Sequence, residues 1–567
     1  MRQLATGKVL AVRAIGGLHV VTLAWDFVDG QKAIRDGFLG FALERSQLNH
    51  GVVVETYFLS GIKRFKSKDT SVPPGTPVPT SDHPIQSFQW GDYTAAPATT
   101  YRYRVVPAYG QPGQIALDDA SSTTVEITTE AEVSGPVGAG LPAHDVYFNR
   151  GVAGSQAYAR KFGQARPDPT KPQSAQMEWL SRGLFEALVG FIGRAAGPDA
   201  KDYGLRGMFY EFRYLPVGQA FAAASKAGAD VAVRYEAQTF KSDNEAMIAQ
   251  AGIAGICQPQ KVRSGIRHNK FMVLIHKGQP VAVWTGSTNV SAGGIFGHSN
   301  LGHVIWDVAL AQRFLDYWNR LADPNVTRAA LVKANLAVEP TPPSKSQPPA
   351  DRMLTLFCPR DDEKTVQTLH WYGDLMDSAQ RIVCMTFAFN LDPIFAQVLE
   401  KPGSTLRYAL FDKDVTASDE TKIDQVANTV IASGAKFQAG DMEGFIGEQL
   451  TGFNKNQYIH DKFMLVDPLG NDPEVVTGTA NFSRPSQYEN DENMVVIRGS
   501  TRVADIYFGE FMRIFDHLYS RYVVEKLKKA GKSDTDTGYL KENGDWVAQN
   551  YQPGTRKDLR RRYFMGG

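Results

Sequence analysis

The sequence predicts an α/β protein in which two similar lobes follow an all-β sandwich, and three observations support this. A polar block occurs twice at one fixed spacing in the later part of the chain. The segments before each copy alternate between strand-like and helix-like patterns, which is the order of a covered parallel sheet. The early part of the chain instead shows short apolar alternations between turn residues, which is typical of antiparallel strands.

The repeated block is the strongest signal. The first copy comprises residues 268–274 and 285–291, and the second comprises residues 460–466 and 477–483. All matched pairs are 192 positions apart (460 − 268 for the histidines), and no gap is needed. The pairs are His268 and His460, Lys270 and Lys462, Gly286 and Gly478, Asn289 and Asn481, and Ser291 and Ser483. Self-similarity at a long fixed spacing indicates two copies of one unit.

The first segment has the pattern of an antiparallel sandwich. Strands are predicted at residues 20–25, 37–45, 101–106 and 123–127. An early Trp25 and a late strand that begins at Tyr101 resemble a fibronectin type III domain. The resemblance implies that Trp25 is the core tryptophan and Tyr101 the corner tyrosine. Residues 66–84 are rich in Pro, Ser, Thr and Asp, so we expect a long, exposed loop without a function of its own.

Both later segments have the same predicted order of elements. The first has a strand at 146–148, a long amphipathic helix at 176–196, and strands at 205–212 and 229–235 on either side of a helix at 220–227. The second has a strand at 355–357, a helix at 363–379, and strands at 381–389 and 405–411. Strand-helix-strand order implies parallel strands.

These patterns divide the chain into five parts. Residues 1–135 are the predicted sandwich, 143–337 the first lobe, 338–351 a Pro-rich linker, 352–525 the second lobe and 526–567 a polar tail with a basic end. We expect the tail to pack partly against the second lobe, with its basic end solvated.

Composition narrows the class of protein. A chain of 567 residues is too long for one core. With 61 Lys+Arg against 60 Asp+Glu, no overall field attracts nucleic acid or a membrane, so any anion site must be local. Three cysteines without CxxC spacing argue against a disulfide framework and a cysteine zinc site. Neither a signal peptide nor an apolar run of roughly 20 residues is visible. These features predict a cytoplasmic protein without a transmembrane segment.

The His-x-Lys order explains what the two copies can do together. Residues two apart on a strand lie on the same face, so each copy offers one imidazole beside one ammonium. A pseudo-twofold axis would bring the two imidazoles across a pocket whose remaining lining is Lys270, Lys462, Asn289 and Asn481. Lysine and asparagine side chains can donate hydrogen bonds to the nonbridging oxygens of a phosphodiester. One histidine can attack phosphorus, while the other protonates the leaving oxygen and then activates water.

The two copies resemble the HxK…N motif of the phospholipase D superfamily, over residues 143–525. The second copy has the complete pattern, namely His460, Lys462, Asp467, Thr479, Asn481 and Glu492. The first copy departs from it, because Ile275 stands opposite Asp467 and Asn300 opposite Glu492. The resemblance implies metal-independent phosphodiester hydrolysis through a phosphohistidine, without a cofactor, and a mainly structural role for the aspartate.

The asymmetry between the copies predicts the role of each histidine. A carboxylate at Glu492 hydrogen-bonded to His460 would raise its pKa, whereas Asn300 beside His268 would orient the ring without adding charge. The neutral imidazole is the nucleophile. His268 is therefore the predicted nucleophile and His460 the predicted general acid, which is also the usual order in single-chain members of the family. The residues predicted to contact the substrate are Ser287, Thr479, Ser483, Asn300 and His303.

A metal site is the main chemical alternative. Four histidines of the first lobe, His268, His276, His298 and His303, lie close together in the sequence. No three-ligand spacing appears among them, which disfavours this interpretation. We expect His298 and His303 to line or support the pocket and His276 to lie at a strand end.

The substrate is the least determined point. Members of the superfamily act on phospholipids, nucleic acids and protein–DNA adducts. Residues 490–497 resemble the bacterial nuclease branch, so a nuclease is favoured and a phospholipase is the alternative. A binding module is the non-catalytic alternative, with Ile275 and Asn300 as marks of decay, although both His-Lys pairs and both asparagines are retained. The fibronectin-like domain could bind a protein, a glycan or nothing.

Overall fold

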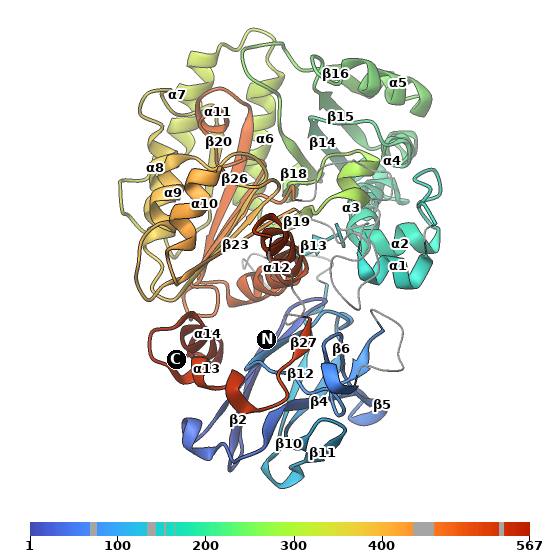
Figure 1. Cartoon of the computed structure of the whole chain (residues 1–567). Helices are drawn as coiled ribbons and strands as arrows, with labels where there is room; N and C mark the ends of the chain where they lie inside the picture. Colours follow the sequence, from blue (N-terminus) through green and yellow to red (C-terminus); the bar gives the residue numbers. More distant parts are fainter. Residues whose placement is uncertain (69–75, 133–142, 152–154, 164, 435–458, 532–537) are drawn as a thin grey trace.

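The computed structural model is a mixed α/β structure, and it describes all residues except 69–75, 133–142, 152–154, 164, 435–458 and 532–537. Two antiparallel sheets at the N-terminal end lie below two seven-stranded sheets that helices cover (Figure 1). Among the described residues, no helix is both long and apolar enough to cross a membrane. The three cysteines are free and buried.

The N-terminal sheets face each other across one core. One has the order β1 (Arg2–Thr6), β2 (Leu10–Gly16), β3 (Val21–Phe27) and β9 (Gln89–Asp92). The other has the order β11 (Gln114–Leu117), β10 (Thr100–Gln111), β4 (Phe38–Asn49) and β5 (Val52–Phe58), with β12 (Thr123–Thr128) paired to β10. Trp25 is fully buried there and packs edge-on against Phe41, with 5.3 Å between ring centroids. The backbone N–H of Ala96 donates to the Tyr101 hydroxyl at 2.9 Å. The predicted strands lie within or overlap β3, β4, β10 and β12.

The expectation of one long exposed loop at residues 66–84 is wrong in part. Residues 69–75 of this segment lie outside the described residues. Further along, β8 (Val78–Pro79) pairs with β6 (Ser60–Gly61), and Thr80 is fully buried. The Thr80 hydroxyl accepts a hydrogen bond from the backbone N–H of Leu43 at 3.0 Å. The segment is held in place because this hydroxyl satisfies a buried backbone donor of β4.

The two seven-stranded sheets have corresponding strand orders. The first is β13 (Ala143–Phe148), β19 (Leu301–Trp306), β18 (Gln279–Gly286), β17 (Lys270–His276), β14 (Tyr203–Phe209), β15 (Asp230–Tyr235) and β16 (Cys257–Pro259). The second is β20 (Leu354–Cys358), β26 (Glu492–Arg498), β25 (Glu474–Gly478), β24 (Phe463–Val466), β21 (Ile382–Phe387), β22 (Leu406–Phe411) and β23 (Thr429–Ser433). In both, the first four pairings are antiparallel and the last two are parallel. The parallel β14–β15 and β21–β22 pairs confirm the strand-helix-strand prediction.

Helices cover both sheets and lie between them. Beside the first sheet are α1 (Gln156–Phe162), α2 (Ala175–Ser181), α3 (Leu184–Gly193), α4 (Leu215–Ala227), α5 (Lys241–Ala251) and a π-helical turn, η7 (Gly293–Gly297). Helices α6 (Val308–Ala322) and α7 (Arg328–Val338) follow. Beside the second sheet are α8 (Gln367–Asp377), α9 (Pro393–Leu399), α10 (Ala417–Asp424) and α11 (Arg484–Tyr488). The 29-residue α12 (Thr501–Lys529) contributes Phe511 to a core that Val273 of β17, Phe463 of β24 and Phe314 of α6 share. One core therefore joins both sheets.

The predicted helix at residues 176–196 is broken, which corrects the expectation of one long helix. Arg182 has a φ of 51° and Gly183 a φ of 92°, and these left-handed residues separate α2 from α3. The buried Arg182 guanidinium donates to Glu510 of α12 at 2.6 Å and to the carbonyl oxygen of His19 at 3.1 Å. The break directs Arg182 into this ion pair, so a tertiary contact overrides the helical periodicity.

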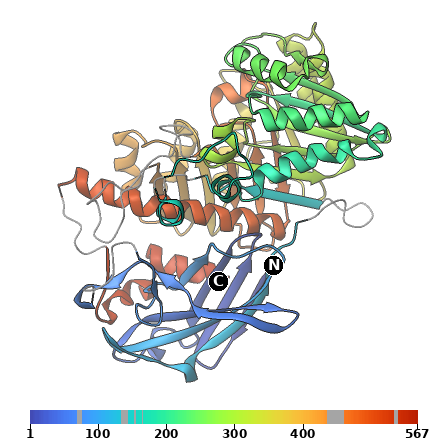
Figure 2. The ribbon, with the colours of Figure 1, turned by 90° about the vertical axis from the view of Figure 1, so that its right-hand side faces the viewer.

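The tail joins the sandwich to the rest of the molecule, more firmly than predicted. Strand β27 (Tyr539–Leu540) pairs with β7 (Arg64–Phe65), and Trp546 enters the core of the sandwich. After α13 (Ala548–Tyr551), α14 (Arg556–Met565) packs on α12, and this whole layer lies between the sandwich and the seven-stranded sheets (Figure 2). Arg561 is largely buried and forms ion pairs with Asp26 and Asp558. The expectation of a solvated basic end is wrong for Arg561, because these carboxylates bind its guanidinium.

Candidate active site

The backbone segments that carry the two histidines each pair with the opposite sheet. A β-bridge joins Arg267 to Asp491, and a second bridge joins Ser299 to Ile459. The backbone N–H of His268 donates to the carbonyl oxygen of Asp491 at 3.1 Å, and that of His460 donates to the carbonyl oxygen of Ser299 at 3.1 Å. The offset of 192 residues converts each of these contacts into the other. The two histidines are therefore held by equivalent, reciprocal crossings between the sheets.

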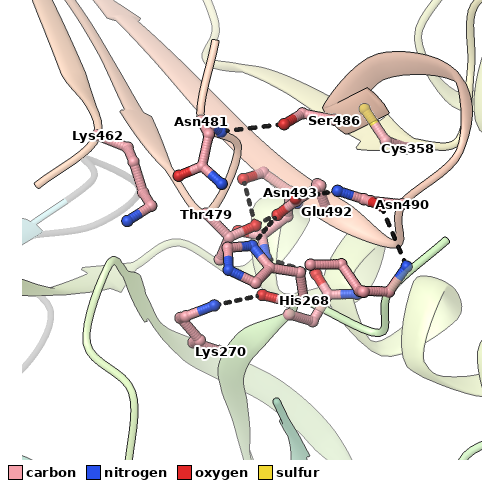
Figure 3. A network of polar contacts seen from close by, with 12 residues as sticks. His268, Lys270, Cys358, Lys462, Thr479, Asn481, Ser486, Asn490, Glu492 and Asn493 are labelled. Atoms are coloured by element: carbon pink, nitrogen blue, oxygen red, sulfur yellow. Dashed lines mark hydrogen bonds and ion pairs between the residues drawn. The ribbon is translucent and has the colours of Figure 1, made fainter. Parts of the chain in front are cut away.

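Each imidazole also bonds to a side chain from the opposite sheet (Figure 3). Nδ1 of His268 lies 2.9 Å from Oε2 of Glu492, and Nδ1 of His460 lies 2.8 Å from Oδ1 of Asn300. The sequence-based pairing of Glu492 with His460 and of Asn300 with His268 is therefore wrong. Each histidine segment bridges to the residue just before Asn300 or Glu492 on the other sheet, which places that side chain beside the other lobe's ring.

The hydrogen bonds of Asn300 fix the tautomer of His460. Its Oδ1 also accepts from the Ser287 hydroxyl at 2.7 Å, and its Nδ2 donates to the Gly294 carbonyl oxygen at 2.7 Å. Since Oδ1 is thus the atom that faces His460, Nδ1 of His460 carries the proton and donates it. The Glu492 carboxylate likewise accepts from Nδ1 of His268. In both neutral rings Nε2 is then the free acceptor.

The two lysines follow the histidines and are almost completely buried. Lys270 Nζ donates to the carbonyl oxygen of His268 at 2.7 Å, and Lys462 Nζ donates to that of His460. Lys270 Nζ also lies 5.1 Å from the centre of the Tyr210 ring. Burial lowers the pKa of Lys270 to about 7, although the nearby carboxylates of Glu492 and Glu211 oppose this shift. Burial, followed by the charge of Lys270, holds the pKa of Lys462 well below its ordinary value.

Burial keeps both histidines neutral in the free protein. It lowers the pKa of His268 to about 4 in spite of the Glu492 carboxylate, which acts in the opposite direction. Burial and the charge of Lys462 hold the pKa of His460 well below its ordinary value. A bound anion would favour the charged forms of all these groups. The site is therefore suited to an anionic ligand that brings its own compensation for buried positive charge.

The two asparagines stand at the ends of β18 and β25. Nδ2 of Asn289 donates to Glu211 at 2.8 Å, and the backbone N–H of Asn481 donates to the Ser486 hydroxyl at 3.2 Å. Within the described part of the chain, Oδ1 of each asparagine is buried without a hydrogen-bond partner. Both amides therefore keep hydrogen-bonding capacity beside the imidazoles.

Three of the predicted substrate contacts, Ser287, Thr479 and Ser483, bond to the protein instead. The Ser287 hydroxyl accepts from the backbone N–H of Leu301 at 3.1 Å, and the Thr479 hydroxyl accepts from that of Asn493 at 2.9 Å. These bonds fix the starts of β19 and β26, where Asn300 and Glu492 stand. The Ser483 hydroxyl lies 2.8 Å from that of Ser486, at the start of α11.

His303 lies behind the site. Its Nε2 is 3.0 Å from Nδ1 of His144, and its Nδ1 is 3.0 Å from the Tyr507 hydroxyl, so both ring nitrogens are engaged in the core. His276 lies at the end of β17 and stacks on Tyr203 with 4.4 Å between ring centroids. Among the described residues, no group of three or more His, Cys, Asp or Glu side chains is arranged to hold a metal ion.

Sequence reasoning missed Tyr210 and Glu211. They directly follow β14, where the Tyr210 ring lies edge-on to His268 with 4.9 Å between centroids. Glu211 holds the Asn289 amide. The available signal was their position, because polar side chains just after a parallel strand lie at the edge of the sheet where sites form.

A scan against family models matches residues 375–518 to the model described as "Cardiolipin synthase, PLD-like domain". The match falls within the second predicted lobe and includes its His-x-Lys motif. It supports the resemblance to the phospholipase D superfamily and, with it, phosphodiester chemistry. A search of the curated proteins found no match.

Three solved structures illustrate the similarity to known folds. The phospholipase D family member Nuc from Salmonella typhimurium is 21% identical, with 32% of this chain and 94% of that chain covered and a TM-score of 0.22. Phosphatidylserine synthase from Haemophilus influenzae is 13% identical (62% and 91% covered, TM-score 0.40). Yeast tyrosyl-DNA phosphodiesterase is 10% identical (54% and 84% covered, TM-score 0.31). Scores this low do not determine function, which has to be argued from the side chains.

Proposed function

We propose that the two seven-stranded sheets belong to two similar lobes that share one active site, and that this site cleaves phosphodiesters through a phosphohistidine on His268. The observation that carries the proposal is the reciprocal pairing of His268 with Glu492 and of His460 with Asn300. Each histidine is oriented by the other lobe, so neither half of the site is complete alone.

The first step uses the different partners of the two rings. Nε2 of neutral His268 attacks phosphorus, and the bond from phosphorus to the leaving oxygen breaks as His460 donates its proton to that oxygen. The Glu492 carboxylate stabilises the positive charge that forms on His268, as a carboxylate partner does for an imidazolium. The neutral amide of Asn300 gives His460 no such stabilisation, which makes its protonated form a stronger acid. Lys270 and Lys462 stabilise the charge on the nonbridging oxygens.

The second step returns the site to its starting state. Neutral His460 takes a proton from water as the water oxygen attacks phosphorus. The bond from phosphorus to Nε2 of His268 breaks, and its electron pair stays on the nitrogen. No further base is needed, because His460 regains the proton that it gave to the leaving group.

We propose nucleic acid as the favoured substrate and phospholipid as the alternative. The half-buried Tyr210 ring lies beside His268, and Phe240 lies edge-on to Tyr210 with 5.1 Å between ring centroids. Such rings suit a base next to the scissile phosphate. The fibronectin type III resemblance of residues 1–135, its protein or glycan partner and the cytoplasmic location stay predictions.

The departures of the first lobe do not favour a decayed binding module. Asn300 orients His460, so it has a defined role in the site. Asp467 accepts from the backbone N–H groups of Arg381 at 2.7 Å and Ile382 at 3.0 Å, which makes it a structural residue. Ile275 replaces only this backbone tether.

The test is cleavage of plasmid, single-stranded DNA, RNA and phosphatidylcholine by the purified protein in EDTA. We expect cleavage of a nucleic acid at a rate unchanged by EDTA within about twofold, since His, Lys and Asn supply the chemistry. His268→Ala is the inactive control. Complete loss in EDTA with rescue by a divalent ion would contradict the mechanism, and cleavage of phosphatidylcholine alone would move the substrate to phospholipid.

A further inference from the structure

A third histidine lies beside His460. The rings of His298 and His460 are tilted by 58°, with 5.0 Å between centroids. His298 follows the π-helical turn η7, and its carbonyl oxygen accepts from Nδ2 of the fully buried Asn149 at 2.9 Å. Its backbone is therefore fixed, and its ring stands on the side of the site that belongs to the general acid.

The equivalent position in the other half is occupied differently. The offset of 192 places Asn490 opposite His298. Asn490 uses both ends of its amide, because Nδ2 donates to Glu492 at 3.3 Å and Oδ1 accepts from the backbone N–H of Ile266 at 3.1 Å. His298 is 3% exposed, yet within the described residues neither of its ring nitrogens has a hydrogen-bond partner. Buried polar atoms are seldom left unpaired, so this ring is suited to a ligand.

The charge state of His298 limits what it can bind. Burial and the charge of Lys462 lower its pKa to about 3, so the ring is neutral near pH 7. A neutral imidazole has one N–H donor and one acceptor nitrogen. A hydroxyl needs both, since it donates one hydrogen bond and accepts another, whereas a phosphate oxygen needs donors only. The ring therefore matches an alcohol or a water molecule better than the phosphate itself.

We propose that His298 binds the acceptor hydroxyl, water or an alcohol, that attacks the phosphohistidine. The proposal rests on the proposed function. Acceptor and leaving group occupy the same side of phosphorus in the two steps, opposite His268, and His460 serves both. His298 accepts a hydrogen bond from the acceptor hydroxyl or donates one to its oxygen and so aims this oxygen at phosphorus. His460 removes the proton, the new P–O bond forms, and the P–N bond to His268 breaks. His298 thus acts as an acceptor-binding residue and forms no covalent bond.

The experiment separates the two chemical steps with a nitrophenyl phosphodiester. Its leaving group departs with little help, so loss of His298 should slow only the second step. For His298→Asn, which copies the opposite half, and for His298→Ala, we expect a burst of nitrophenol of wild-type amplitude within about twofold. Steady-state turnover should fall about tenfold or more, with more phosphohistidine trapped on quenching. His276→Asn, at a strand end in the same lobe, is the matched control and should behave as wild type.

A second measurement tests acceptor choice. With added methanol, the ratio of methyl phosphodiester to phosphomonoester product should change by about threefold or more in the His298 variants, because the residue that holds the acceptor is changed. An unchanged ratio together with wild-type turnover would overturn the inference, and so would loss of the burst in His298→Asn. Absence of trapped phosphohistidine from the wild-type protein would instead refute the proposed function.

Discussion

The His268 half and the His460 half of the site share their backbone geometry but differ in the partner of the imidazole. Both histidine N–H groups donate across the sheets at 3.1 Å, whereas one ring meets the carboxylate of Glu492 and the other the amide of Asn300. A nearby opposite charge shifts a pKa by about one to three units, each worth about 1.4 kcal/mol. Duplication therefore supplies the scaffold, and a single side chain in each half separates the nucleophile from the acid.

The largest expected effect comes from removing either histidine. His268→Ala and His460→Ala should each lower kcat by about 10³ or more for a nucleic acid substrate, and the double variant should be little worse than either, as for residues that act as a unit. Steady-state assays with folding checked by circular dichroism measure this. Half of the activity in each single variant would mean two independent sites.

Removing the carboxylate should have the next largest effect. Glu492→Gln keeps the shape of the pair but loses the charge that stabilises phosphorylated His268, so we expect a loss of about 10² in kcat and in the rate of the burst. The stopped-flow burst of a nitrophenyl phosphodiester is the readout. If Glu492→Gln lowered turnover of poor leaving groups only, Glu492 would be serving the acid instead.

The reverse substitution gives the amide side a carboxylate. In Asn300→Asp the added charge raises the pKa of His460, which makes its protonated form a weaker acid. We expect about tenfold slower cleavage of an alkyl leaving group and little change for nitrophenol. Equal slowing of both substrates would show that Asn300 acts through packing and not through the acid.

Anion binding should be linked to proton uptake, since the buried cations are suppressed in the free site. At pH 8, above the pKa of about 7 for Lys270, a bound sulfate favours the charged lysine and should take up roughly one proton. Titration calorimetry in two buffers of different ionisation enthalpy measures the uptake. Lys270→Met is expected to reduce it, and binding without uptake in the wild type would contradict the assigned shift.

The smallest effect on catalysis is expected far from the site. Trp546 lies in the sandwich core, with 5.7 Å between its ring centroid and those of Phe38 and Phe88. Trp546→Ala should cost about 3–5 kcal/mol of sandwich stability and lower the first thermal transition. The turnover number of folded protein should stay within about twofold of wild type. A large loss of turnover would show that the tail acts on the site.

Local patterns predicted the parts of the molecule that depend on neighbouring residues. The period of β14 and β15, and the His-x-Lys order, are properties of short segments, so the strands and the two motifs could be inferred from them. The partner of His268 depends on which sheet edge its loop meets, and no spacing within one lobe contains that information. The break at Arg182 and the burial of Arg561 likewise depend on ion pairs with residues far away in the sequence. The role predicted for His268 is kept, but it now rests on the carboxylate beside it.

The most direct test of the account is the position of the phosphorylated residue. After rapid quenching of the wild-type protein with a nitrophenyl phosphodiester, peptide mass spectrometry under conditions that preserve acid-labile phosphate should locate the phosphoryl group on His268. The His460→Ala variant should accumulate more of it, because hydrolysis of the intermediate needs the base. Phosphate on His460, with none on His268, would reverse the roles and contradict the argument that Glu492 selects the nucleophile.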